Sequence, residues 1–327
     1  MNPNVTAAAP AFVRAPRRVP APIPPHLIQD DDLAPAAVDE IFELAAQVKA
    51  HPRRYAHALD GRYLAVIFEK RSLRTRFTFE LGMKTLGGES VFMDTGTQRI
   101  PDREPICDVA RNLARWVDAV ALRTFTHASV EDFARYSSVP IINGLSELYH
   151  PCQSLTDLFT LHEVAGDLRQ AKLAFVGDGN NVAHSLMLCG ALCGAHVAVA
   201  TPSSYAPKAE IVARAREIAG STGARIETGY APEEAVSGAH AVYTDVWASM
   251  GFEHEAEERA RAFAPFRVTR QLMEQALPGA AFMHCLPAHR GEEVTEEVIE
   301  SAQSVVFDQA ENRLHIAKAI LLMLLAR

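Results

Sequence analysis

A cysteine lies where an apolar run of the sequence ends. Residues 281–286 (Ala-Phe-Met-His-Cys-Leu) predict a buried strand, and Pro287 follows it. Open parallel sheets bind their ligands at the carboxyl ends of their strands. The Cys285 thiol, with His284 and His289 nearby, is therefore a candidate reactive or ligand-binding group. A lone cysteine more often only packs in the core, so this interpretation needs complementary chemistry elsewhere in the chain.

A cluster of hydroxyl and guanidinium groups supplies that chemistry. Residues 72–76 (Ser-Leu-Arg-Thr-Arg) follow a predicted strand at 63–68 and begin a predicted helix at 72–87. The N-terminus of a helix attracts anions through its unpaired N–H groups and its partial positive charge. The Ser72 and Thr75 hydroxyls can reach the same anion, and arginine binds phosphate with two parallel hydrogen bonds. The alternative is a basic surface turn partnered by Glu69 and Glu80, but this combination favours a phosphate site.

Two common nucleotide-binding motifs are missing from the sequence. No GxxxxGK[ST] loop is present. Residues 177–181 (Gly-Asp-Gly-Asn-Asn) follow a predicted strand at 173–176, but Val182 stands where a dinucleotide-binding turn has its third glycine. No acidic residue ends the next predicted strand at 196–200. A nicotinamide-dependent dehydrogenase is therefore disfavoured.

Helix and strand patterns alternate along the chain and must position these groups. The remaining predicted strands cover 117–122, 139–142, 240–244, 281–286 and 304–307, and the remaining helices cover 130–136, 153–165, 182–193, 206–218, 292–301 and 309–325. Such alternation is typical of parallel sheets with helices on both faces. We predict an α/β fold of two doubly wound parallel-sheet lobes joined by helices, with the active site in the interdomain cleft.

The predicted division of the chain has three parts. Residues 1–26 form a Pro-rich tail without acidic residues, which predicts disorder; a transit peptide is the alternative. Residues 27–150 form a first domain, on which the C-terminal helix at 309–327 packs back. Residues 151–308 form a second domain. The length of 327 residues agrees with two domains.

Composition excludes several classes of partner. The net charge is -8 and no long basic run is present, so nucleic acid is not an expected partner. No apolar stretch is long enough to span a bilayer, so no membrane is expected either. Five cysteines with no CxxC pair argue against a disulfide framework and a structural zinc site, and predict a cytoplasmic location.

Five motifs in order identify a family resemblance. They are residues 72–76, 150–153 (His-Pro-Cys-Gln), 177–181, 245–251 (Asp-Val-Trp-Ala-Ser-Met-Gly) and 284–287 (His-Cys-Leu-Pro). Together they closely resemble the aspartate/ornithine carbamoyltransferase family over residues 27–325. The last two motifs are those that select ornithine rather than aspartate. The resemblance implies transfer of the carbamoyl group of carbamoyl phosphate to the δ-amine of L-ornithine, giving L-citrulline and phosphate without a covalent intermediate, a metal or another cofactor.

The resemblance also implies roles for single residues. Carbamoyl phosphate is expected to contact Ser72, Leu73, Arg74, Thr75, Gln98, Arg123, His150, Gln153 and Arg313. L-Ornithine is expected to contact Asn181, Asp245, Ser249, Met250, Cys285 and Leu286. The catalytic groups among them are Arg74, Arg123, His150, Asp245 and Cys285. The family usually has Thr where Leu73 stands, but the backbone N–H there can still bind phosphate, so we expect only a modest effect on affinity.

Assembly and substrate are the two remaining expectations. The resemblance implies a homotrimer with shared active sites, in which the loop around Gln98 reaches a neighbouring subunit; residues 100–104 depart from the usual short Gly-rich link there. One alternative is a carbamoyltransferase for another amine, such as putrescine or N-acetylornithine. The other is a non-catalytic paralogue that binds a phosphorylated metabolite.

Overall fold

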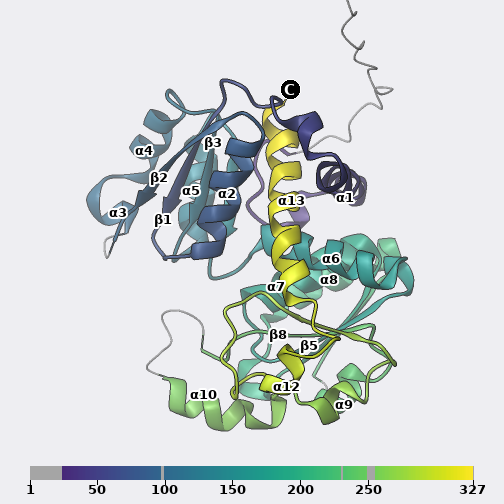
Figure 1. Ribbon diagram of the computed structural model, residues 1–327. Coiled ribbons are helices and arrows are strands. Elements are labelled where there is room, and N and C mark those ends of the chain that lie inside the picture. Colours follow the sequence, from purple (N-terminus) through teal and green to yellow (C-terminus); the bar gives the residue numbers. More distant parts are fainter. Residues whose placement is uncertain (1–23, 97–98, 230, 249–254, 327) are drawn as a thin grey trace, which may run out of the picture.

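Two parallel sheets organise the chain into two lobes (Figure 1). The computed structural model describes residues 24–96, 99–229, 231–248 and 255–326. The first sheet has the order β2-β1-β3-β4 and the second has the order β7-β6-β5-β8-β9. All neighbouring strands are parallel, as predicted. The α/β fold of two doubly wound lobes is thus confirmed.

The first lobe is built from four strands and the helices around them. The strands are β1 (Tyr63–Phe68), β2 (Glu89–Asp94), β3 (Ala119–Arg123) and β4 (Ile141–Leu145). The helices are α1 (Pro35–Ala50), α2 (Leu73–Thr85), α3 (Ile100–Arg103), α4 (Ile106–Leu113) and α5 (His127–Tyr136), with short 3-10 turns η1 (Asp30–Asp32) and η2 (Pro52–Tyr55). Five of the six β1 side chains are buried, as expected for a strand between two helical layers.

The second lobe repeats this plan with five strands. They are β5 (Lys172–Val176), β6 (His196–Ala200), β7 (Arg225–Thr228), β8 (Ala241–Thr244) and β9 (Ala281–His284). Its helices are α7 (Asn181–Cys193), α8 (Ala209–Thr222), α9 (Pro232–Val236), α10 (Ala256–Phe263), α11 (Arg270–Met273) and α12 (Glu296–Ile299), with 3-10 turns η3 (Leu168–Gln170), η4 (Ser203–Tyr205) and η6 (Ala264–Phe266).

Two long helices join the lobes. Helix α6 (Pro151–Ala165) follows β4, and its residues 151–161 are all buried. Helix α13 (Val306–Leu325), yellow in Figure 1, packs against α1 and α2 of the first lobe and against α6. One apolar cluster continues from the first lobe through these helices into the second lobe. The two lobes therefore share part of their core, which fixes residues of α6 and α13 beside both sheets.

Strand order brings the motifs to two points. In each sheet the order reverses beside the first strand, between β1 and β3 and between β5 and β8, and such reversals are where open sheets bind ligands. Phe68 is paired with Arg123, so the loop after β1 meets the end of β3. Thr244 is paired with His284, so the next residues, Asp245 and Cys285, emerge side by side.

The structure corrects two predicted elements. The predicted strand at 304–307 is wrong: Ser304 makes only an isolated bridge with Phe282, and α13 already begins at Val306. The predicted helix at 292–301 shrinks to α12, because the preceding residues form turns in which Gly291 N bonds to the Val294 carbonyl. Within the described residues, no helix is both long and apolar enough to cross a membrane.

Candidate active site

The start of helix α2 has the features of an anion site. Ser72 is the N-cap residue, and its Oγ accepts a hydrogen bond from the Thr75 N–H at 3.3 Å. The two hydroxyl oxygens lie 3.0 Å apart. Arg74, in the first turn, is half-buried, and burial lowers the pKa of its guanidinium, although the nearby Cys285 and Asp245 side chains oppose this shift. A residue of the first lobe therefore lies within electrostatic reach of two residues of the second.

Arg313 of α13 is the hub of a buried polar cluster. Its Nη2 donates to Thr75 Oγ1 at 2.7 Å and lies 3.3 Å from His150 Nε2. Its Nη1 donates to Gln153 Oε1 at 2.7 Å. Arg313 is 6% exposed, so its charge is held in place by these contacts rather than by bulk water. The predicted phosphate and carbamoyl residues of α2, α6 and α13 are therefore brought together.

Arg123 adds a second buried cation at the end of β3. Burial lowers the pKa of its guanidinium to about 9, and the nearby charges of Arg313 and Arg74 contribute to this shift. Its Nε atom has no hydrogen-bond partner among the described residues. Three guanidinium groups that repel one another at one place suit a ligand with several negative charges, such as a phosphate dianion.

His150, which precedes helix α6, is held as a neutral imidazole. Burial lowers its pKa well below the usual value, and the charges of Arg313 and Arg123 lower it further. Its backbone N–H donates to Ser185 Oγ at 2.8 Å, which fixes the start of α6 against α7. Its Nδ1 is buried and has no partner among the described residues. A neutral imidazole can donate one hydrogen bond to an oxygen that gains negative charge.

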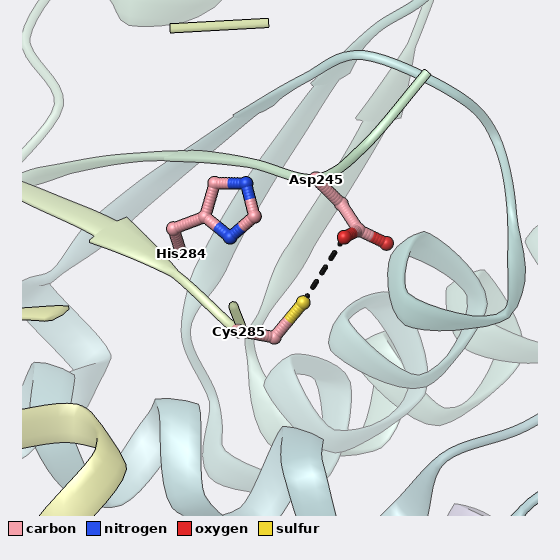
Figure 2. Close-up of side chains that lie close together, drawn as sticks. All are labelled: Asp245, His284 and Cys285. Carbon is pink, nitrogen blue, oxygen red and sulfur yellow. Dashed lines mark hydrogen bonds between the residues drawn. The ribbon is translucent and has the colours of Figure 1, made fainter. Parts of the chain in front are cut away.

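Asp245 and Cys285 form a pair at the carboxyl ends of β8 and β9. Figure 2 shows the Cys285 thiol pointing at the Asp245 carboxylate, and the thiol donates to Asp245 Oδ1 at 3.1 Å. Burial raises the pKa of the Cys285 thiol well above its usual value, and the Asp245 charge raises it further. The thiol is therefore protonated at neutral pH, so it acts as a hydrogen-bond donor and not as a thiolate nucleophile.

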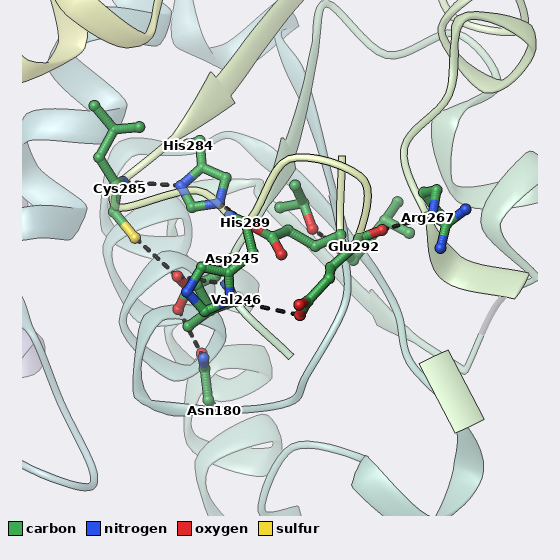
Figure 3. A network of polar contacts seen from close by, with 12 residues as sticks. Asn180, Asp245, Val246, Arg267, His284, Cys285, His289 and Glu292 are labelled. Carbon is green, nitrogen blue, oxygen red and sulfur yellow. Dashed lines mark hydrogen bonds and ion pairs between the residues drawn. The ribbon is translucent and has the colours of Figure 1, made fainter. Parts of the chain in front are cut away.

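Asn180 completes this pair, as the network in Figure 3 shows. Its Nδ2 donates to Asp245 Oδ2 at 2.8 Å, while its Oδ1 caps α7 by accepting from Val182 N at 2.9 Å. The sequence analysis assigned the neighbouring Asn181 instead. Asn181 donates to the Ser146 carbonyl at 2.7 Å, so its amide ties α7 to the turn before α6. Sequence reasoning missed Asn180, although an N-cap asparagine after a glycine turn was a usable signal.

His284 supports the turn that carries Leu286. Its Nδ1 accepts the Leu286 N–H at 2.8 Å, and its Nε2 lies 3.1 Å from the buried Glu293 carboxylate. Leu286 has a φ of 58°, a left-handed conformation that is unfavourable for leucine, and the His284 contact helps to hold it. Asp245, His284 and Cys285 lie close enough to hold a metal ion. Both ring nitrogens of His284 are already in hydrogen bonds, which a metal would have to displace.

The polar contacts described above leave out four further predicted residues. Gln98, Ser249 and Met250 lie outside the described residues. Leu73, the first residue of α2, is 69% exposed, and its side chain does not join the polar cluster. Apart from Asn181, which binds the Ser146 carbonyl, the other predicted residues lie around the Arg313 hub or around the Asp245–Cys285 pair. The electrostatic contacts of Arg74 and Arg123 with Cys285 connect these two groups.

Comparison with known proteins gives the same family along the whole described chain. Residues 25–163 match the aspartate/ornithine carbamoyltransferase carbamoyl-P binding domain, and residues 169–324 match the Asp/Orn binding domain of the same family. The chain is 50% identical over 301 residues to an ornithine carbamoyltransferase of Acidothermus cellulolyticus, covering 92% of this chain and 96% of that protein. It is 50% identical over 267 residues to an anabolic ornithine carbamoyltransferase of Pyrococcus furiosus, covering 82% and 85%.

Solved structures agree with the sequence comparison. The structure of ornithine carbamoyltransferase from Pyrococcus furiosus superposes with a TM-score of 0.89 at 46% identity, covering 92% of this chain and 96% of that chain. That from Thermus thermophilus superposes with a TM-score of 0.83 at 45% identity, covering 93% and 100%.

Proposed function

Because the chain belongs to the aspartate/ornithine carbamoyltransferase family, we propose that it is an enzyme that transfers the carbamoyl group of carbamoyl phosphate to the δ-amine of L-ornithine. The products are L-citrulline and phosphate, and the reaction belongs to arginine biosynthesis. The observation that carries this proposal is the Cys285–Asp245 pair lying within electrostatic reach of Arg74 and Arg123. One end of the site suits an anion and the other suits an amine.

The phosphate group of the first substrate is assigned to the first lobe. Ser72, Thr75 and the backbone N–H groups at the start of α2, including that of Leu73, donate to its oxygens. Arg74, Arg123 and Arg313 neutralise its charge. We assign residues 27–150 to carbamoyl phosphate, with residues 309–327 supplying Arg313, and residues 151–308 to ornithine. Gln98, outside the described residues, is proposed to reach the site of a neighbouring subunit.

The carbamoyl carbonyl is assigned to the Arg313 hub. Attack on the carbonyl carbon turns its oxygen into an oxyanion before the C–O bond to phosphate breaks. Arg123, Thr75 and neutral His150 are placed to donate hydrogen bonds to that oxygen, which stabilises the transition state more than the ground state. Gln153 lies on the same hub and contacts the carbamoyl NH2 group. The phosphate leaves with the electron pair of the broken bond and takes up the proton that the attacking nitrogen loses, so that L-citrulline and hydrogen phosphate result.

The amine is assigned to the Asp245–Cys285 pair. A δ-amine with a pKa near ~10.4, like that of lysine, is mostly protonated at neutral pH and must lose a proton before it attacks. Three nearby guanidinium groups and burial both lower the pKa of an amine. Asp245, the Cys285 thiol and the Leu286 backbone then orient the neutral amine towards the carbonyl carbon. Asn181, Ser249 and Met250 are proposed to contact the rest of ornithine.

Direct attack by the amine needs no enzyme nucleophile. The thiol assigned to the amine end of the site, Cys285, remains protonated because burial and Asp245 raise its pKa. The chemistry then consists of positioning and charge stabilisation, which the named side chains can supply without a metal or another cofactor. Carbamoyl phosphate already carries a good leaving group.

We further propose that the protein is a homotrimer. Leu73, Phe77 and Leu81 lie four residues apart along α2 and are 69%, 55% and 41% exposed. Val91 and Met93 of the edge strand β2 are also exposed. The apolar face of α2, formed by Leu73, Phe77 and Leu81, would be a liability in a lone subunit, and so would the exposed edge strand. A second copy is the proposed occupant, since the face begins beside Ser72 and a copy bound there would adjoin the phosphate site.

We place the protein in the cytoplasm. All five cysteines are free, including Cys189 and Cys193, which lie one helical turn apart. Such cysteine usage is typical of a reducing compartment.

Product analysis tests the proposed reaction. The protein is incubated with carbamoyl phosphate and L-ornithine, and L-citrulline and inorganic phosphate are quantified over time. Equal amounts of both products, formed in proportion to enzyme concentration, support the transfer. Phosphate release without citrulline would contradict it. Binding of carbamoyl phosphate with no turnover of any amine would instead favour a metabolite-binding paralogue.

A further inference from the structure

Asp157 is a buried carboxylate inside α6, one helical turn after Gln153. Its Oδ1 atom accepts two hydrogen bonds, from Gln153 Nε2 at 2.7 Å and from Gln309 Nε2 at 2.6 Å. A carboxylate oxygen that takes two donors acts purely as an acceptor. Asp157 therefore dictates which end of each neighbouring amide faces it.

The amide of Gln153 is turned by this contact. Because Nε2 faces Asp157, Oε1 faces the opposite way and accepts from Arg313 Nη1 at 2.7 Å. The reversed amide would set oxygen against a carboxylate oxygen and NH2 against a guanidinium, and both contacts would be repulsive. An amide oxygen has two lone pairs. Gln153 can therefore hold Arg313 and still accept a hydrogen bond from a ligand.

We propose that Asp157 is a positioning residue that keeps the amide oxygen of Gln153 turned towards the reacting carbamoyl group. The inference rests on the proposed function, in which Gln153 lies beside that group. The NH2 of carbamoyl phosphate is a donor and needs an acceptor. Acetyl phosphate has nearly the same shape, but its methyl group cannot donate. Asp157 thereby makes the site selective for carbamoyl phosphate over acetyl phosphate.

Asp157 also orients the amide of Gln309, which contacts the second lobe. Its Nε2 binds Asp157, and its Oε1 accepts the backbone N–H of His284, the residue before Cys285, at 2.9 Å. One carboxylate thus fixes an amide in the carbamoyl pocket and another behind the ornithine pocket. Loss of Gln309 leaves the Asp157–Gln153 bond in place, so the two arms can be separated by mutation.

The orientation of Gln153 does not require a charge on Asp157. Burial raises the pKa of this carboxyl to about 7. Both amides bind Oδ1, so a proton would reside on Oδ2, which neither amide contacts. The buried Tyr243 hydroxyl interacts with the same carboxyl. Asparagine can present the same single oxygen to both amides. Leucine and alanine cannot.

The test compares selectivity among variants at position 157. The KM for carbamoyl phosphate is measured by citrulline formation, and the inhibition constant of acetyl phosphate is measured as a competitor. The measure of selectivity is the inhibition constant of acetyl phosphate divided by the KM for carbamoyl phosphate. We expect Asp157→Leu and Asp157→Ala to lower this ratio by about tenfold or more, which is the value of one hydrogen bond to a donor group. Asp157→Asn should restore selectivity to within roughly twofold of the wild type, because it keeps the acceptor.

Three controls separate positioning from packing. Affinity for inorganic phosphate, by calorimetry, should change less than about threefold in all position 157 variants, because the phosphate ligands are untouched. Asp308→Leu, at an exposed position beside Gln309, should leave all constants unchanged. Gln309→Met should raise the KM for ornithine, because it removes the acceptor for His284 N. It also removes a donor to Asp157 but leaves the Asp157–Gln153 bond, so the acetyl phosphate ratio should stay unchanged.

An unchanged ratio in folded Asp157→Leu or Asp157→Ala protein would overturn the inference. A parallel fall in phosphate affinity would also overturn it, because it would indicate a general loss of structure. If neither variant folds, Gln153→Met removes the amide oxygen directly. Retained selectivity in that variant would also overturn the inference. If the wild type forms no citrulline, the proposed function has failed instead, and the affinities of both acyl phosphates can still be compared by calorimetry.

Discussion

Arg313 of α13 donates a hydrogen bond to Thr75 Oγ1 of α2 at 2.7 Å, across 238 positions of sequence. This contact links the C-terminal helix to the anion site of the first lobe. Buried apolar side chains pack α13 on the first lobe, although it follows the second in sequence, and they hold Arg313 at this site. The same guanidinium holds Gln153, so one side chain orients groups for the phosphate and for the carbamoyl group.

Loss of Arg74 should remove binding of carbamoyl phosphate. Arg74→Ala deletes one of three guanidinium groups and leaves the other two in place. We expect affinity to fall roughly a hundredfold, the value of a charge-assisted contact with phosphate in a partly buried site. Isothermal calorimetry with carbamoyl phosphate measures this directly. The matched control is Arg76→Ala. Arg76 lies two residues further along α2, and its guanidinium pairs with Glu80 at 2.9 Å. Normal affinity in Arg74→Ala would refute the phosphate assignment.

Cys285 should matter for the amine and not for phosphate. Cys285→Ser keeps a hydrogen-bond donor towards Asp245. The hydroxyl oxygen is smaller than sulfur and lies closer to Cβ, so the geometry of the contact changes. We expect ornithine turnover to fall about tenfold or more, with carbamoyl phosphate affinity nearly unchanged. Steady-state kinetics for ornithine, together with calorimetry for carbamoyl phosphate, separates the two effects. A large loss of carbamoyl phosphate affinity would place Cys285 in the other half of the site.

The apolar face of α2 should control assembly. Phe77→Glu puts a charge in the middle of this face, which is costly to bury in an interface. We expect the trimer to dissociate to smaller species, as measured by light scattering coupled to size-exclusion chromatography. Phe307→Glu, at a phenylalanine that is also highly exposed, is the matched control and should leave the assembly intact. A variant Phe77→Glu that remains trimeric would show that another surface forms the interface.

Asp30 should make stability depend on pH. It is buried in η1 against the Ser154 and Ser185 hydroxyls, and burial raises its pKa from 3.8 to about 7. Between these values the unfolded chain releases a proton that the folded protein retains, so this carboxyl lowers stability as pH rises from about 4 to about 7. Asp30→Asn removes this dependence.

Urea unfolding at pH 5 and pH 8 tests the sign. The stability of Asp30→Asn relative to the wild type should increase as the pH rises, whatever its value at pH 5. A difference between the two proteins that stays constant over this range would mean that Asp30 titrates normally.

The sequence predicted the buried strands well and the exposed strands poorly. Strands such as β1 and β5 are apolar runs bounded by turns, so their pattern is clear. The strands β2 and β7 were not predicted, because β2 has no buried residue and β7 has only Ile226. The other two edge strands, β4 and β9, are buried and keep the apolar signal, so edge position alone did not hide a strand.

The candidate site divides in the same way. Residues in motifs at strand ends, such as Arg74 and Cys285, were predicted and lie together. Asp157 and Gln309 were not predicted, because they lie inside helices and touch one another across 152 positions of sequence. Asn180 and Asn181 are adjacent, and only the fold shows which of them faces Asp245. Partners of this kind depend on tertiary packing rather than on local pattern.

The choice of second substrate tests the proposed function most directly. The value of kcat/KM for carbamoyl transfer is measured with L-ornithine, putrescine, N-acetylornithine and L-aspartate at saturating carbamoyl phosphate. We expect L-ornithine to be preferred by at least about a hundredfold, since its δ-amine and its free amino acid end are both proposed to find partners in the second lobe. Preference for putrescine, N-acetylornithine or aspartate would contradict the assignment of the Asp245–Cys285 pair to ornithine.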